Sequence, residues 1–214
     1  MPVTPQWRAA HDILGKDIAK AARRDGLTIT SVSGLVNTNR RYPSVIPVLI
    51  DWLKHAEHRV PLTDPFDLDR FRSSIYRALT TIDAMGTEAV PLLMSEFYRE
   101  PQQSPGTLDA AANALRYLAV PSDFDRIAAL ASDRSLGSGR AALLEWLITQ
   151  GTPEGLQIVV EQIDDETVRA LGIKFIRQYK PLPAGLRPVI EHYLDDPDSE
   201  VRKQATRTLR KILD

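Results

Sequence analysis

A pair of apolar helical stripes recurs along most of this chain at intervals of about thirty residues. The pair is clearest near the end, where apolar side chains follow helical spacing through 186–194 and again through 201–213. Between them, the acid-rich stretch 195–198 breaks the first helix and supplies caps for the second. The second stripe begins with Val-Arg-x-x-Ala, in which the Arg is Arg202. The spacing therefore predicts a helical hairpin.

Similar segments occur upstream, each with an aliphatic residue seven positions after the Arg position. Five residues occupy that position: Arg72, Leu108, Arg140, Arg169 and Arg202. The steps between them are 36, 32, 29 and 33 residues, and two-helix units repeated at such intervals are typical of an α-solenoid. We predict an all-α fold, a right-handed α-solenoid of about five hairpins. The predicted hairpins cover 43–82, 86–119, 121–150, 153–179 and 183–213.

Two further segments precede the hairpins. Residues 5–24 have an amphipathic period, and we expect them to form a helix that caps the first repeat. Residues 26–41 have no helical period and are expected to form a loop, a length at which loops are often functional. We therefore predict a single repeat domain over 1–214, with the hairpins in 43–214.

The acid-rich turn followed by Val-Arg-x-x-Ala resembles HEAT repeats, most closely in residues 186–213. Two repeats depart from the pattern, since Gly139 replaces the aliphatic residue before Arg140, and Leu108 replaces the Arg. The segments RRYPSVIPVLIDWL and FRSSIYRALTT are also similar to small bacterial HEAT-like proteins, some of which are toxin-neutralising immunity proteins. The resemblance implies an armadillo-type helical repeat protein that binds another protein as a scaffold, adaptor or inhibitor.

We call a set of equivalent positions in successive repeats a column. On the second helices, the columns separate core positions from surface positions. Three and seven residues after the Arg position, the side chains are small or aliphatic, which predicts the core face. For the Arg column, two interpretations remain open. The Arg residues either pair with acids of neighbouring turns, for which Asp133, Asp165 and Asp198 are placed, or they contact a partner directly.

Five and eight residues after the Arg position, basic side chains predominate and share one face of each helix. In HEAT-like solenoids the second helices line the concave surface, so the resemblance implies a basic stripe there. The predicted partner-binding residues are Arg77, Arg116, Lys174, Arg177, Arg207 and Arg210. The predicted second helices carry a net charge of +4 and the first helices −9. The stripe would bind an acidic protein surface or tail, the acidic layer could instead bind a basic partner, or both charge patterns could serve helix dipoles and solubility alone.

Candidate catalytic chemistry is sparse, and we predict no catalytic residues, no metal and no cofactor. Asp51, His55 and His58 share a helical face with metal-ligand spacing, but the same residues are typical of a polar helix end. Residues 137–140 could hold a phosphate at a helix start but lack the Lys-Ser/Thr of a P-loop. The absence of cysteine excludes thiolate catalysis.

The alternative function is a nucleic-acid binder or a DNA glycosylase-like enzyme, because some alkylpurine glycosylases are HEAT-like with a basic groove. The resemblance would require an Asp one turn after a Trp. Here the residues four positions after the three tryptophans are His11, Ala56 and Gln150. The net charge of −1 also argues against binding driven by phosphate neutralisation.

The composition indicates where in the cell the protein is expected to reside. Hydrophobic residues make up 43% and charged residues 26%, as in ordinary globular proteins. No apolar run approaches a membrane span, and residues 1–17 have no signal-peptide core. We therefore expect a cytoplasmic protein that does not enter membranes. The composition leaves the oligomeric state open.

Overall fold

The computed structural model describes residues 4–60 and 62–212, which form α-helices and short 3-10 turns and contain no strand. The all-α prediction is confirmed. The chain divides into two compact units, Met1–Ala119 and Val120–Asp214, which we describe one at a time.

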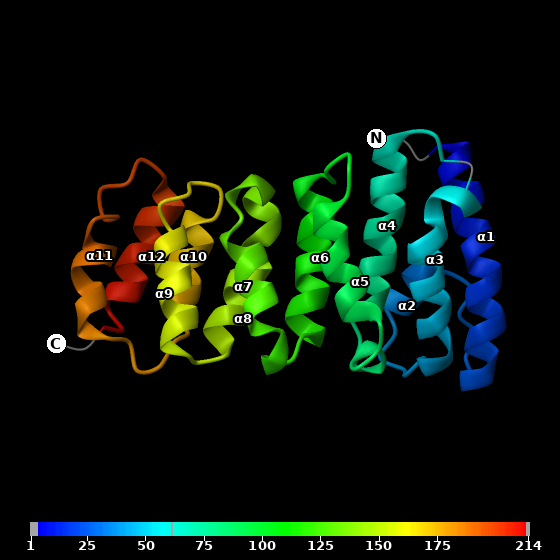
Figure 1. Cartoon of the computed structure of the whole chain (residues 1–214), viewed down its shortest axis with the longest axis horizontal. Coiled ribbons are helices and arrows are strands. Elements are labelled where there is room, and N and C mark those ends of the chain that lie inside the picture. The colour runs from blue at the N-terminus through cyan, green and yellow to red at the C-terminus, as the bar shows by residue number, and fades with distance from the viewer. Residues whose placement is uncertain (1–3, 61, 213–214) are drawn as a thin grey trace. The chain divides into compact units, whose positions relative to one another are not determined.

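The first unit opens with α1 (Pro5–Ala22). Thr4 caps it by accepting a hydrogen bond from the Trp7 N–H, and Pro5 occupies the first turn, where its missing N–H costs nothing. The predicted stripe of α1 is buried at Ala10, Leu14, Ile18 and Ala21, whereas Trp7 is half-buried. The helix packs against α2, α3 and α4, described below, and so covers one end of this unit (Figure 1).

The stretch 26–41 contains a short helix, α2 (Val32–Val36), where the sequence predicts only a loop. Ser31 caps this helix by accepting a hydrogen bond from the Gly34 N–H, and Val32 and Leu35 are buried. A single turn shows too little periodicity to be recognised in sequence.

Two hairpins complete the first unit. Their helices are α3 (Ile46–Arg59) with α4 (Pro65–Leu79), and α5 (Ala89–Ser95) with α6 (Pro105–Leu118). Within each hairpin the two helices pack together, and α4 also packs closely on α6. The second helices of consecutive hairpins therefore lie side by side.

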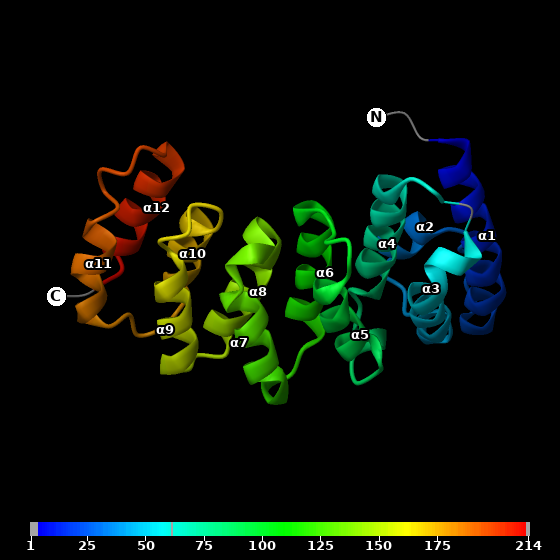
Figure 2. The ribbon, with the colours of Figure 1, turned by 45° about the horizontal axis from the view of Figure 1, so that its top comes forward.

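Three hairpins form the second unit (Figure 2). Their helices are α7 (Phe124–Ser132) with α8 (Ala141–Thr149), α9 (Pro153–Gln162) with α10 (Arg169–Ile176), and α11 (Arg187–Glu191) with α12 (Ser199–Leu209). Again the second helices are neighbours, because α10 packs on both α8 and α12.

The core prediction for the second helices is confirmed with one exception. Nine of the ten side-chain positions three and seven residues after the Arg position are buried, and Leu209 in the last turn of α12 is partly exposed. Gly172 belongs to this column because α10 passes close to the end of α9. A Cβ atom there would lie 2.8 Å from Cγ2 of Ile163.

Candidate partner-binding face

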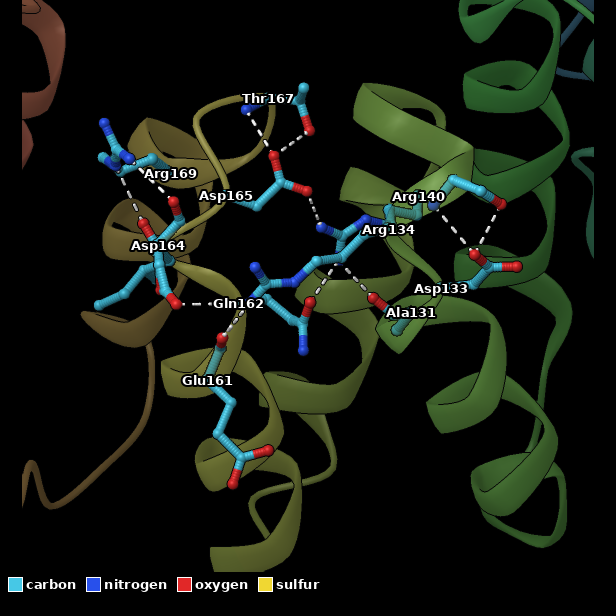
Figure 3. Close-up of polar contacts among 12 residues, drawn as sticks. Ala131, Asp133, Arg134, Arg140, Glu161, Gln162, Asp164, Asp165, Thr167 and Arg169 are labelled. Atoms are coloured by element: carbon cyan, nitrogen blue, oxygen red, sulfur yellow. Dashed lines mark hydrogen bonds and ion pairs between the residues drawn. The ribbon is translucent and has the colours of Figure 1, made fainter.

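Arginines of the Arg column form ion pairs and hydrogen bonds with other residues of the protein. The Arg140 side chain is fully buried, and its guanidinium donates to the carbonyl oxygen of Ala131, to Oε1 of Gln162 and to the carboxylate of Asp165 (Figure 3). Hydrogen bonds from Thr167 and Arg140 lower the pKa of Asp165 below its ordinary value, although burial opposes this. The predicted pairing of Asp165 is therefore confirmed, and it links one hairpin to the next.

Arg169 makes the corresponding link to the last hairpin. Its Nη1 lies 3.2 Å from Oδ2 of Asp196, and its guanidinium also donates to the carbonyl oxygens of Ile163 and Asp164. Asp196 thus takes the role that the sequence suggested for Asp198. Asp196 lies in the turn between α11 and α12, six residues before Arg202, so spacing from the repeated Arg favours Asp198 and does not identify Asp196.

The other two acids of that prediction cap helices. Asp133 accepts a hydrogen bond from the Ser135 N–H and Asp198 accepts one from the Glu200 N–H. Each satisfies a backbone N–H that has no partner inside its own helix. Both acids begin helical segments, so their capping role competes with pairing to the Arg column.

In the first unit Arg72 pairs with Glu96, a residue that the sequence analysis missed. The two side chains are almost fully buried, and the guanidinium donates to both carboxylate oxygens at 2.6–2.9 Å. The internal pairing is therefore confirmed for Arg72, Arg140 and Arg169. Arg202 is exposed and, among the described residues, its guanidinium donates only to the carbonyl oxygens of Asp196 and Pro197, so for this residue both interpretations stay open. The columns five and eight residues after the Arg position therefore form the candidate binding face.

Four of the six predicted basic residues lie on two helices of the second unit that pack together. Lys174, Arg207 and Arg210 are exposed, and Arg177 is half-buried. Arg177 Nη1 donates to Oε1 of Gln204 at 3.0 Å, which joins α10 to α12. The hydroxyl of Thr208 donates to the Ile173 carbonyl oxygen at 3.0 Å and makes a second link.

We name Lys174, Arg177, Arg207 and Arg210 the basic face. Its exposed members are not held by side-chain carboxylates within the described residues, apart from a longer-range attraction between Arg207 and Glu200. The ammonium of Lys174 lies 5.7 Å from the ring centre of Phe175. These cations therefore keep their charge available to solvent, which suits recognition of an acidic surface.

Carboxylates mark the borders of the basic face. Glu145 on α8 accepts a hydrogen bond from Gln178 at 3.1 Å. Hydrogen bonds from Lys203 and Gln204 lower the pKa of Glu200 on α12 below its ordinary value. Acidic side chains therefore lie near the basic face on both α8 and α12.

The remaining two predicted residues lie in the first unit. Arg77 on α4 and Arg116 on α6 are both exposed. Arg116 donates to Oδ1 of Asn113 at 3.2 Å. The six residues are therefore divided between the two units, and a continuous stripe through all of them stays a prediction.

The two weaker motifs have local structural roles. Nδ1 of His55 contacts the carbonyl and carboxylate oxygens of Asp51, which also pairs with Arg59. The described residues contain no group of three or more potential metal ligands. Gly137 has a positive φ of 53° inside the turn that leads to the buried Arg140, so residues 137–140 form a helix entry.

Comparison with known families gives one match. The HEAT repeat family matches residues 186–214, which contain α11 and α12. No curated protein and no solved structure matches the chain. Among the described residues, no helix has the length and apolar character needed to span a membrane.

Proposed function

We propose that this chain, a HEAT-like helical repeat protein, is a non-enzymatic interaction module that binds an acidic surface or tail of another protein. HEAT repeats generally mediate protein–protein interaction, and each repeat offers side chains on an extended surface. The proposal includes the predicted right-handed solenoid and a cytoplasmic scaffold, adaptor or inhibitor role. The observation that carries it is the basic face on two packed helices.

Charge and rigidity support this assignment. Lys174 and Arg207 project from helices that are fixed to each other by the Arg177–Gln204 and Thr208–Ile173 hydrogen bonds. Cations on rigid elements lose less conformational entropy on binding than cations on loops. Complementary charges raise the association rate and fix orientation more than they raise affinity.

Affinity capture with charge-reversal variants tests the proposal. The chain is immobilised, and partners are captured from lysate treated with nuclease. The test variant is Lys174→Glu/Arg207→Glu, which changes exposed residues without removing the links between α10 and α12. The matched control is Lys16→Glu/Arg126→Glu, which makes the same charge change at exposed positions on α1 and α7.

The expected result is a protein that binds the parent and the control and is lost from the test variant. A partner retained equally by both variants would place recognition elsewhere on the chain. Recovery of nucleic acid, or loss of all binding after nuclease treatment, would favour the nucleic-acid alternative. In that case affinity should fall by orders of magnitude between low and moderate salt.

A further inference from the structure

A pocket in the first unit is lined by cations and hydroxyl groups and has no carboxylate in its lining. Its volume is 410 Å³, and it lies between α1, α4 and the start of α6. The lining residues are Trp7, Phe66, Arg70, Ser73, Ser74, Arg77, Ser104, Gly106 and Thr107. Three other pockets in the same unit each include carboxylates, such as Glu57, Asp17 and Glu88.

Two arginines supply the charge. Arg70, Ser73, Ser74 and Arg77 occupy positions i, i+3, i+4 and i+7 of α4, so they share one helix face. Arg70 lies over the rings of Trp7 and Phe66 at 5.5 and 5.7 Å, and its closest carboxylate contact is Asp67 at 3.9 Å. Stacking of this kind fixes a guanidinium without using its N–H donors.

The Arg77 side chain is exposed and makes no hydrogen bond or ion pair within the parts of the chain that the structure describes. One carboxylate, that of Asp109, is near enough to be affected by its charge. Burial raises the pKa of Asp109 above its ordinary value, and Arg77 partly opposes that rise. The pocket therefore has two guanidinium groups that local acids do not fully neutralise.

Several hydroxyl and backbone donors beside these cations are already used within the protein, since Ser74 donates through Oγ to the Phe71 carbonyl oxygen at 2.6 Å. Ser104 donates through Oγ to the Thr107 hydroxyl at 3.0 Å, and the Ser104 N–H donates to Oδ2 of Asp69. Gly106 lies in the first turn of α6, where backbone N–H groups point out of the helix. The indole N–H of Trp7 is buried without an acceptor among residues 4–60 and 62–212. The two guanidinium groups are therefore the main donors that this pocket offers to a ligand.

We propose that this pocket binds the dianion of a phosphate monoester that carries an aromatic or other apolar group. Two guanidinium groups match a charge of about −1.5 to −2 at neutral pH, and their N–H groups can donate to the terminal oxygens. Phe66 is 45% exposed and, with Trp7, offers an apolar surface for the organic group. The inference does not depend on the proposed function, because Arg77 is one of the six predicted partner-binding residues but not a member of the basic face.

Gly106 provides a blocking variant that leaves the fold intact. A Cβ atom there meets no other atom within 4 Å, and an acid in the first turn of a helix is stabilising. Gly106→Glu should therefore place a carboxylate beside the two arginines and compete with the ligand. Lys16→Gln, an exposed change outside the pocket, is the control.

Isothermal titration at constant ionic strength and pH 7.5 tests the proposal with three probes: phenyl phosphate, inorganic phosphate and dimethyl phosphate. We expect saturable 1:1 binding of phenyl phosphate, with inorganic phosphate weaker because it lacks the apolar group. Gly106→Glu, Arg70→Gln and Arg77→Gln should each weaken binding about tenfold or more, as expected for a lost charge-assisted hydrogen bond. Lys16→Gln should bind as the parent does, and Asp109→Asn should bind more tightly.

Two outcomes would overturn the proposal. One is the absence of saturable phenyl phosphate binding, or binding that is unchanged in both Gly106→Glu and Arg77→Gln while thermal melts show folded protein. The other is equally tight binding of dimethyl phosphate, which would indicate a site for phosphodiesters. Neither outcome affects the proposed function, whose test variants lie on α10 and α12.

Discussion

Arg72 and Glu96 form a buried bidentate ion pair that joins α4 to the end of α5. Tyr76 donates its hydroxyl to Oε2 of Glu96 at 2.6 Å, and the amide of Gln103 donates to the same oxygen at 2.9 Å. The carboxylate is therefore surrounded by donors from two segments of the first unit, α4 and the stretch before α6. A buried charge pair of this kind is tolerated only when its remaining hydrogen-bonding capacity is satisfied.

Removing one charge of this pair should be costly. Glu96→Gln leaves the Arg72 guanidinium buried without a counterion, and we expect a loss of about 3 kcal/mol in the free energy of unfolding. The double variant Arg72→Met/Glu96→Gln should lose less than the sum of the two single variants, because no orphaned cation remains. Urea unfolding followed by circular dichroism measures all three values.

The exposed pair Lys54–Glu88 serves as the control for this cycle. Solvent screens both of its charges, so Glu88→Gln should leave the unfolding midpoint close to that of the parent. Equal losses for Glu88→Gln and Glu96→Gln would show that burial does not determine the strength of these pairs.

The repeat pattern in the sequence was sufficient to predict all five hairpins and most of the core. The spacing is local, and a helical hairpin buries its apolar stripes against sequence neighbours. The pairing of Arg140 with Asp165 could also be predicted, because a buried guanidinium needs an acid. Glu96 and Asp196 were missed because many acids lie near the repeated Arg positions, and helix caps compete for them.

The candidate sites were harder to predict than the fold. The basic face follows from periodicity, since Lys174 and Arg207 occupy the same column on helices that pack together. The pocket between α1, α4 and α6 could not be predicted from the sequence, because it combines Trp7, the α4 face around Arg70 and the start of α6. Residues 7 and 104 are far apart in sequence and belong to no shared repeat column. Only the packing of α1 and α6 on α4 brings them together.

Gly15 is required by the close approach of α1 to the segment before α2. A Cβ atom at Gly15 would lie 2.5 Å from the carbonyl oxygen of Thr30. Gly15→Ala should therefore destabilise the protein by about 1–3 kcal/mol despite the higher helix propensity of alanine. Thermal melting compares it with Gly106→Ala, whose Cβ enters open space. A rise in the melting temperature of Gly15→Ala would contradict the close contact.

Stability should decrease when the solution is acidified below about pH 6.5, because of His11. Burial, together with the charge of Arg70, lowers the pKa of His11 below its ordinary value of 6.5, although its hydrogen bond to the Trp7 carbonyl opposes the shift. The unfolded chain therefore binds a proton that the folded chain does not. The stabilisation is complete above pH 6.5 and is lost as the pH falls below it.

Chemical unfolding at pH 7.5 and pH 5.5 measures this dependence. His11→Phe keeps an aromatic ring next to Trp7, on which His11 stacks at 3.6 Å, and should reduce the difference between the two pH values. His58→Gln changes an exposed histidine and should leave the difference as in the parent. An unchanged pH dependence in His11→Phe would assign the effect to another group.

The hydroxyl of Thr208 should hold α12 against α10. It is fully buried and donates to the Ile173 carbonyl oxygen at 3.0 Å, a link between the two helices that carry the basic face. Thr208→Val keeps the shape and removes the donor, so we expect a loss of about 1 kcal/mol in the free energy of unfolding. Thr206→Val is the matched control, because the exposed Thr206 hydroxyl bonds only to the Arg202 carbonyl oxygen of its own helix. Amide hydrogen exchange should show faster opening of α12 in Thr208→Val but not in Thr206→Val, and equal exchange in both variants would mean that apolar packing alone holds the helices together.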